Sequence, residues 1–353
     1  MKKCVEYEGN MMKEFTGYKK GINLGGWLSQ CGNDYTEDRY QNYIVESDFA
    51  KIASWGLDHV RIPIDYNVIQ NEDGSFIETG FAHVDRALEW CDKYGLNAIL
   101  DIHKAKGFVF DDKNYCSFFT DTETQGIFIK LWREIAHRYG ERKNVAFELL
   151  NEVTSPDFAK PWNEIIAKTV PAIREIAPDT RIIVGGIYNN SIYGLTLMDQ
   201  PVDENMVFTF HCYSPFVFTH QKAAWVEKMT PECDCVFPLP ADEMREASKN
   251  IFGMDFDAEF EGLGKNLIDS LYFKKMFEQA IQVAEEVNVP LYCGEYGVID
   301  QADCESTVNW YREIHKALEE CNISRAAWTY KEMDFGITTK HLLPVMNDII
   351  ELL

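Results

Sequence analysis

Two glutamates in this chain stand where short apolar runs end. Glu152 closes the run 146–151 (AFELLN), and Glu295 closes the run 290–294 (PLYCG). Apolar runs of this length, bounded by polar residues, are typical of buried strands. A carboxylate at the end of a buried strand is costly unless it is paired or used in chemistry. We therefore expect both acids to meet at one face of a sheet or barrel.

Paired carboxylates can hydrolyse a glycosidic bond. When they lie about 5–5.5 Å apart on either side of that bond, hydrolysis proceeds with retention of configuration. One must be protonated and the other ionised, so their surroundings must differ. Arg61 beside Glu295 would lower the pKa of Glu295 and keep it ionised, and Tyr213 could donate a further hydrogen bond. Glu152 has no cation assigned to it and is the better proton donor, with His211 to orient it.

The apolar pattern also predicts the elements that position these acids. Eight apolar runs alternate with amphipathic, helical segments, which is typical of an α/β fold with a parallel sheet. A chain of 353 residues could form two ordinary domains or one large barrel. We predict a single (β/α)8 TIM barrel domain over residues 1–353. The expected strands span 21–28, 59–64, 97–103, 145–152, 181–186, 206–213, 290–297 and 326–331.

In barrels of this kind the active site lies at the carboxyl ends of the strands. Polar and aromatic side chains end six of the eight expected strands. Each has an ordinary structural explanation when taken alone, but their convergence on one rim favours a functional site. Asn151 is placed to bind the 2-hydroxyl of a sugar. The full set is Arg61, His103, Asn151, Glu152, His211, Tyr213, Glu295 and Trp328.

The connection after the sixth expected strand is too long for a simple loop. It spans about residues 214–270 and is rich in aromatic and acidic residues. A connection of this length is usually functional or forms a small subdomain. Because it follows the carboxyl end of a strand, we expect this inserted subdomain over the active-site face. Its Phe216, Phe218 and Trp225, together with Trp27, could serve as sugar platforms or pack in the core.

Composition narrows the range of partners. The net charge of −23 would repel phosphate backbones, which argues against nucleic acid. No stretch approaches the roughly 18 apolar residues of a membrane span, so we expect no membrane partner. The N-terminus lacks the apolar core of a secretory signal, and the 10 cysteines form no C-x-x-C pair. We expect a cytoplasmic monomer with reduced thiols, without metal or cofactor.

Several longer motifs resemble glycoside hydrolase family five, the cellulase-type family within a large clan of retaining barrel glycosidases. They include GINLGGW, HVRIPIDY, AFELLNEV, LYCGEYGVI and AWTYKEMDF, and they extend over essentially the whole chain. The resemblance implies Glu152 as the acid/base and Glu295 as the nucleophile. It also implies that the other six rim residues line the subsite that holds the attacked sugar.

One motif departs from the family pattern. After the third strand, family members often carry a His-His pair followed by Ala-Pro-Gly. This chain reads His103-Lys104-Ala105-Lys106-Gly107. His103 is the matching histidine, whereas the two lysines place cations near the cleft that could alter neighbouring subsites.

We predict a metal-independent, retaining endo-β-glucanase acting on β-1,4 or mixed β-1,3/1,4 glucans or oligosaccharides. The same mechanism could act on another β-glycan, such as mannan or xyloglucan, or serve an exo-acting oligosaccharide hydrolase. Two other classes are a binding protein that has lost catalysis and a metal-dependent barrel hydrolase. Both glutamates with their orienting partners argue against the first. The second would need a His/Asp cluster on the first strand, which offers Asn23 and Trp27 instead.

Overall fold

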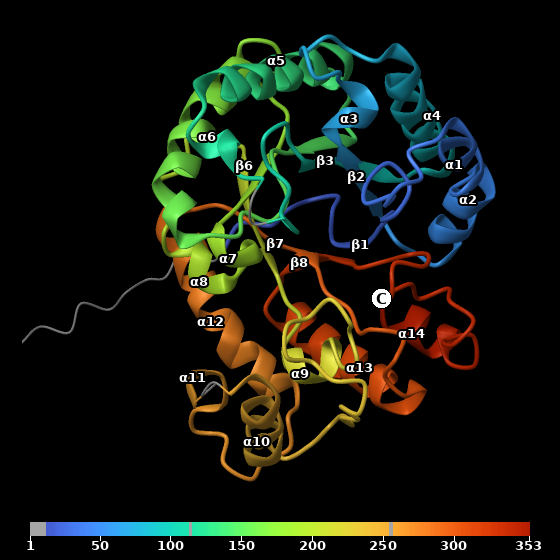
Figure 1. The fold of residues 1–353 in the computed structure, drawn as a ribbon, viewed down its shortest axis with the longest axis vertical. Coiled ribbons are helices and arrows are strands. Elements are labelled where there is room, and N and C mark those ends of the chain that lie inside the picture. Colours follow the sequence, from blue (N-terminus) through green and yellow to red (C-terminus); the bar gives the residue numbers. More distant parts are fainter. Residues whose placement is uncertain (1–11, 113–114, 254–256) are drawn as a thin grey trace, which may run out of the picture.

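A computed structural model describes residues 12–112, 115–253 and 257–353. Eight parallel strands pair in chain order and close into a barrel. Helices surround this barrel (Figure 1). The predicted (β/α)8 TIM barrel is therefore confirmed. The strands are β1 Lys20–Asn23, β2 His59–Asp65, β3 Asn97–Lys104, β4 Val145–Glu148, β5 Ile182–Gly185, β6 Met206–His211, β7 Leu291–Glu295 and β8 Ser324–Ala327.

Helices follow the strands around the ring, with shorter ones in the connections. Among the described residues, no helix combines the length and apolar character needed to cross a membrane. The α-helices are α1 Glu37–Asn42, α2 Glu46–Ser54, α3 Tyr66–Ile69, α4 Glu78–Tyr94, α5 Thr122–Tyr139, α6 Ala159–Arg174, α7 Ile187–Asn190, α8 Ile192–Leu195, α9 Phe216–Thr219, α10 Ala241–Phe252, α11 Asp257–Phe260, α12 Ser270–Val287, α13 Cys304–Glu320 and α14 Met346–Leu352.

Six of the strands, including β4 and β8, end earlier than the sequence pattern predicts. β4 ends at Glu148, so Asn151 and Glu152 lie in the loop that follows. The N–H of Asn151 donates to the carbonyl of Ile102 in β3 at 3.0 Å, which ties this loop to the neighbouring strand. β8 ends before Trp328. An apolar run that continues into a buried loop cannot be told from a longer strand by its pattern alone.

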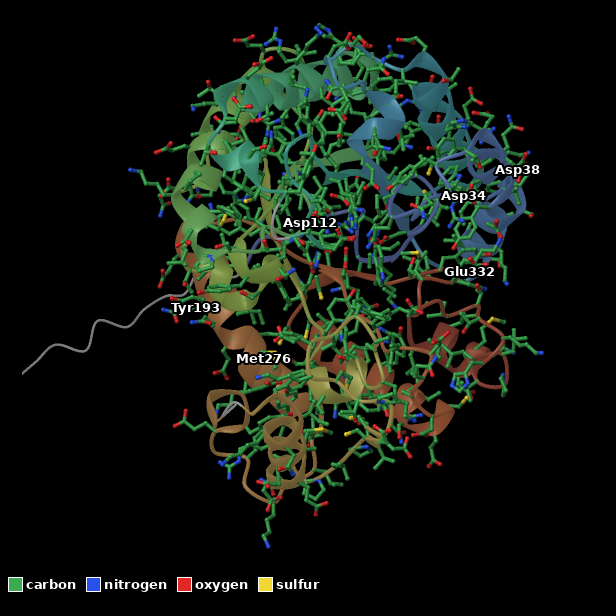
Figure 2. The ribbon with its side chains drawn as sticks, viewed as in Figure 1. Asp34, Asp38, Asp112, Tyr193, Met276 and Glu332 are labelled. Atoms are coloured by element: carbon green, nitrogen blue, oxygen red, sulfur yellow. The ribbon has the colours of Figure 1, made fainter. Side chains whose placement is uncertain are left out.

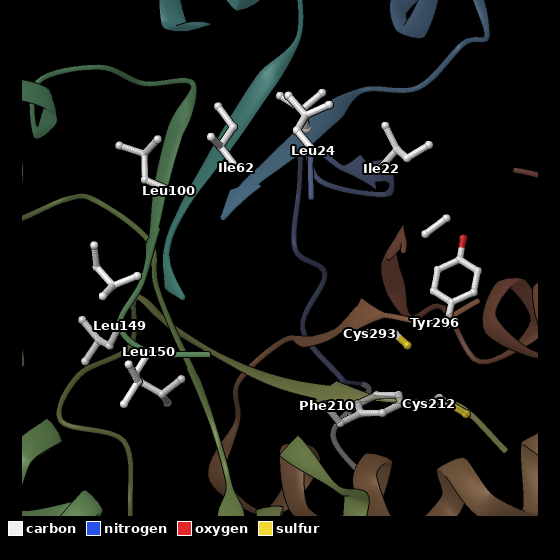
Figure 3. Packing of buried hydrophobic residues seen from close by; sticks show 14 of the residues in the cluster. Ile22, Leu24, Ile62, Leu100, Leu149, Leu150, Phe210, Cys212, Cys293 and Tyr296 are labelled. Atoms are coloured by element: carbon white, nitrogen blue, oxygen red, sulfur yellow. The ribbon is translucent and has the colours of Figure 1, made fainter. Parts of the chain in front are cut away.

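The apolar side chains of the strands form two separate packed layers. One face, including Ile62, Leu100 and Phe210, belongs to the large core that includes residues of the surrounding helices (Figure 3). The other face forms a smaller cluster with Ile99 and Tyr292, consistent with the two-residue period of a strand. On β3, Asp101 and His103 continue the face of Ile99, so this face turns polar toward the carboxyl end.

The connection 214–270 contains α9, α10 and α11. Figure 1 shows α10 and α11 at the periphery, next to α12. Inside it, Phe218 packs against Phe237 with ring centroids 5.4 Å apart. Its first residues reach the rim, where the ring of His220 lies 5.1 Å from that of Tyr213. The beginning of this connection, rather than its helical bulk, therefore contacts the predicted site.

Gly80 allows α4 to pack closely on α3. A Cβ built at Gly80 would lie 1.8 Å from the carbonyl oxygen of Val68. We expect Gly80→Ala to lower the free energy of unfolding by about 1–3 kcal/mol, because the two helices must separate. Gly126→Ala in α5 is the matched control, since nothing lies within 4 Å of its added Cβ. There the better helix propensity should stabilise by up to about 1 kcal/mol. Urea unfolding measures both changes, and a Gly80→Ala variant as stable as wild type would contradict this packing.

Candidate active site

Arg61 in β2 is the centre of a buried polar network. Its guanidinium donates to both oxygens of Glu148, at 2.7 and 2.9 Å. It donates to Glu295 at 2.8 Å and to Asn151 at 2.9 Å, and lies 3.0 Å from Asp101. Burial opposes its charge, but the three carboxylates raise the pKa of Arg61 well above its ordinary value. Arg61 is therefore a permanent cation inside the barrel.

Glu295, the last residue of β7, is held by a cation and a phenol. Its Oε1 accepts from Arg61, and its Oε2 accepts from the hydroxyl of Tyr213 at 3.0 Å. Burial nevertheless raises the pKa of Glu295 to about 7, against the pull of Arg61. The prediction that Arg61 brings the pKa of Glu295 below its ordinary value is therefore wrong, because loss of hydration outweighs the guanidinium.

Glu152 has uncharged partners. Its Oε1 lies 2.8 Å from Nδ1 of His211, and its Oε2 accepts from Nδ2 of Asn189 at 2.7 Å. Burial lowers the pKa of His211 to about 4, so the imidazole is neutral near pH 7. Burial also raises the pKa of Glu152 to about 7. Near neutral pH this carboxyl is therefore able to exist in either protonation state.

The two acids face each other at short range. One oxygen of Glu152 and one of Glu295 lie within 4.8 Å. This agrees with the roughly 5–5.5 Å separation of retaining glycosidases rather than the roughly 6.5–9.5 Å of inverting ones. Their pKa values are both raised to about 7 and do not show which acid ionises first, but their hydrogen-bond partners differ. The guanidinium that donates to Glu295 favours its ionised form, whereas Glu152 accepts from a neutral amide.

The same groups could hold a metal ion. Nδ1 of His211 lies within 4.8 Å of the two carboxylate oxygens that face each other. One nitrogen and two oxygens are a reasonable donor set for a divalent ion. Binding an ion there would replace the hydrogen bond between His211 and Glu152. That hydrogen bond already gives both side chains a partner without an ion.

His103 and Trp328 stack at the rim, with ring centroids 5.6 Å apart and planes 3° from parallel. Burial lowers the pKa of His103 well below its ordinary value, so the ring is neutral. Its Nδ1 lies 2.7 Å from Asp101, which also contacts Arg61. Through these contacts the structure brings all eight predicted site residues into one network.

Five residues of this network were not predicted as site residues from the sequence. A carboxylate inside a buried strand is costly, and this signal could have found Asp101 and Glu148. Asn189 lies in α7, which has a left-handed and not a right-handed helical backbone at Tyr188 and Asn189, and no sequence pattern marks it. The five are Asn23, Asp101, Glu148, Asn189 and Asn190.

The candidate sugar platforms separate into core and surface residues. Trp27 is fully buried and stacks on Trp90 with ring centroids 6.4 Å apart. Phe218 is also fully buried. These two are core residues, and a role as platforms is excluded by their burial. Phe216 and Trp225 are 38% and 57% exposed and remain candidates.

The two lysines after β3 both lie near acids. Nζ of Lys104 lies 3.7 Å from Asp111, and Nζ of Lys106 lies 3.7 Å from Glu72. Partly exposed pairs of this kind contribute little to stability. Their influence on neighbouring subsites stays a prediction.

Comparison with known proteins decides the family. The family description "Cellulase (glycosyl hydrolase family 5)" matches residues 16–334. The chain belongs to glycosyl hydrolase family 5. This family 5 protein is 42% identical over 331 residues to Cellodextrinase A from Ruminococcus flavefaciens, covering 93% of this chain and 88% of that one. It is 39% identical over 340 residues to Endoglucanase C from Acetivibrio thermocellus, covering 95% and 98%. The crystal structure of endoglucanase Cel5A from Thermotoga maritima matches with a TM-score of 0.73 at 26% identity, covering 96% and 97%.

The family 5 protein is thus a glycoside hydrolase of the endoglucanase or cellulase type. Retaining hydrolysis, which is typical of the family, needs one protonated and one ionised carboxyl group. The network described above provides unlike partners for two such groups.

Ionisation of Glu152 should cost this family 5 enzyme stability. Its folded-state pKa is about 7, whereas an unfolded glutamate ionises near about 4.3. Folding therefore favours the protonated form of Glu152. Its contribution to the free energy of unfolding is lost as the pH rises from about 4.3 to 7. We expect Glu152→Gln to raise Tm by a few degrees at pH 8 and by less at pH 5. Thermal unfolding at both pH values, with the exposed Glu141→Gln as control, measures this. A Tm difference that does not change with pH would contradict it.

Proposed function

We propose that this protein is a retaining endo-β-glucanase that hydrolyses β-1,4 or mixed β-1,3/1,4 glucans through a covalent glycosyl-enzyme. The observation that carries the proposal is the pair of Glu152 and Glu295, with facing oxygens within 4.8 Å and unlike partners. The names of two relatives, a cellodextrinase and an endoglucanase, support a β-glucan substrate.

In the first step Glu152 gives its proton to the glycosidic oxygen while a Glu295 oxygen attacks the anomeric carbon. The bond to the leaving sugar breaks, and an ester to Glu295 forms. Arg61 and Tyr213 hold the attacking carboxylate in place and favour its ionised form before the attack. Glu152 becomes ionised as the leaving sugar departs.

In the second step Glu152 acts as a base. It takes a proton from water, whose oxygen attacks the anomeric carbon and releases Glu295. Arg61 also orients Asn151 for this chemistry. Its Nη2 donates to Oδ1 of Asn151, which directs the amide Nδ2 to act as donor to the sugar 2-hydroxyl. That contact strengthens in the transition state.

The roles of the two acids are tested by their neutral replacements. We expect Glu295→Gln to lower kcat on barley mixed-linkage glucan by about 10³-fold or more, because no nucleophile remains. Glu152→Gln should lose about 10²–10⁴-fold on glucan, where the leaving oxygen needs a proton. On 2,4-dinitrophenyl β-cellobioside the Glu152→Gln variant should give a burst of dinitrophenol, because this group leaves unprotonated and deglycosylation is then slow. Near wild-type hydrolysis by Glu295→Gln would overturn the nucleophile assignment.

A second candidate is an enzyme that prefers short oligosaccharides. It is favoured by the 42% identity to a relative named Cellodextrinase A. An endo-acting enzyme should lower the viscosity of carboxymethyl cellulose well before reducing ends accumulate. Cellobiose released steadily from cellohexaose, without loss of polymer viscosity, would favour the oligosaccharide hydrolase. Product sizing on mannan and xyloglucan in the same experiment tests the other β-glycans.

A further inference from the structure

The segment after β5 has an unusual backbone. Tyr188, Asn189 and Asn190 all have positive φ, at 55, 57 and 52°. This left-handed region is costly for residues with a side chain, and asparagine tolerates it better than most. Three such residues in succession persist only where surrounding contacts fix them. This segment, α7, therefore has a backbone conformation that is fixed by its surroundings, and it does more than connect β5 to α8.

Close packing fixes this segment. A Cβ on Gly186 would lie 2.3 Å from the carbonyl carbon of Gly194, so α8 packs directly on the start of the turn. The N–H of Asn189 donates to the carbonyl of Val153 at 3.1 Å, which ties the turn to the residue after Glu152. Tyr193 in α8 lies at the outer edge of the molecule (Figure 2), whereas Asn189 and Asn190 reach the site.

The turn contacts Glu152 by two routes. Nδ2 of Asn189 donates directly to Oε2 at 2.7 Å. Nδ2 of Asn190 lies 3.3 Å from Nε2 of His211, whose Nδ1 lies 2.8 Å from Oε1. Both oxygens of this one carboxyl group are thus held from the same turn, one directly and one through the imidazole.

We propose that Asn189, carried on the left-handed turn 188–190, is a positioning residue for Glu152, holding its carboxyl group in one orientation through both steps of the reaction. This inference rests on the proposed function, in which Glu152 is first an acid and then a base. A carboxyl group with two roles must stay in place while its charge changes. The neutral amide of Asn189 donates to the ionised form without adding a full charge.

The hydrogen bond also has a pH signature. Donation from Asn189 favours the ionised form and lowers the pKa of Glu152, so its loss raises that pKa. One such hydrogen bond is worth about a three- to tenfold change in an equilibrium constant. The basic limb of the pH–rate profile reports loss of the protonated acid, so it should move upward by about half to one pH unit. Other charged or titratable groups near Glu152 are Arg61, Asp101, His211, Tyr213 and Glu295.

Asn189→Gly is the decisive variant, because glycine keeps the positive φ and removes only the amide. Asn288→Gly is the matched control. Asn288 also has a φ of 57°, but it caps α12 before β7, at the opposite end of the barrel from the rim. We expect Asn189→Gly to lower kcat on cellotetraose about three- to tenfold with little change in KM, and to shift the basic limb upward. Its rate of dinitrophenol release in the burst from 2,4-dinitrophenyl β-cellobioside should change less, and Asn288→Gly should match wild type in every measurement.

Asn189→Asp provides a second test, because it keeps the size and the turn preference but places a negative oxygen against Oε2. It should shift the basic limb further upward than Asn189→Gly. A ¹³C-NMR titration of the Glu152 carboxyl carbon, assigned with Glu152→Gln, measures the pKa without substrate. A wild-type Glu152 pKa and pH profile in both Asn189 variants would overturn this inference and leave the proposed function intact. An inactive wild-type enzyme in which the pKa shift is still seen would overturn the proposed function instead.

Discussion

The rest of the site depends on the buried guanidinium of Arg61, which contacts three carboxyl groups. Arg61 binds Glu148 through both ends of its guanidinium fork and also reaches Asp101 and Glu295, thereby joining four strands of the barrel. A charge buried in this way is tolerated only because it is paired and fully hydrogen-bonded. Three carboxyl groups contact this one guanidinium, and Glu152 lies close enough for its pKa to be lowered by the same charge. Burial raises the pKa values of Asp101, Glu152 and Glu295 to about 7, against the attraction of Arg61.

Burial explains how an acid can be kept protonated near neutral pH. The pKa values of Glu152 and Glu295 are raised by the same cause and to the same range, so burial alone cannot assign their roles. The distinction comes from the donors. Glu295 accepts from a permanent cation, whereas Glu152 accepts from an amide and lies against a neutral imidazole. Two acids in one pocket are thus separated by the charge of their neighbours.

The sequence predicted the barrel because its strands are apolar on both faces and alternate with helices. Together these two features are typical of a parallel sheet covered by helices. It also predicted the rim residues, since parallel strands deliver their last side chains to one end. What it could not show is which interior residues oppose one another once the barrel closes. Glu148 therefore looked like part of an apolar run, although it is the main partner of Arg61. The sequence also could not show that Trp27 is a core residue and not a sugar platform. Its partner in stacking, Trp90, lies in α4 and is 63 positions away in the chain.

The loops position the parts of the site that the strands do not hold. Asn151 and Glu152 are loop residues, fixed by a hydrogen bond to β3 and by contacts from the turn after β5. On the other side, the beginning of the connection 214–270 places His220 against Tyr213, which in turn donates to Glu295. Each acid is therefore supported by a different loop, while both share the barrel that contains Arg61. Loop changes can then adjust one acid at a time, whereas a change at Arg61 alters every carboxyl group that depends on it.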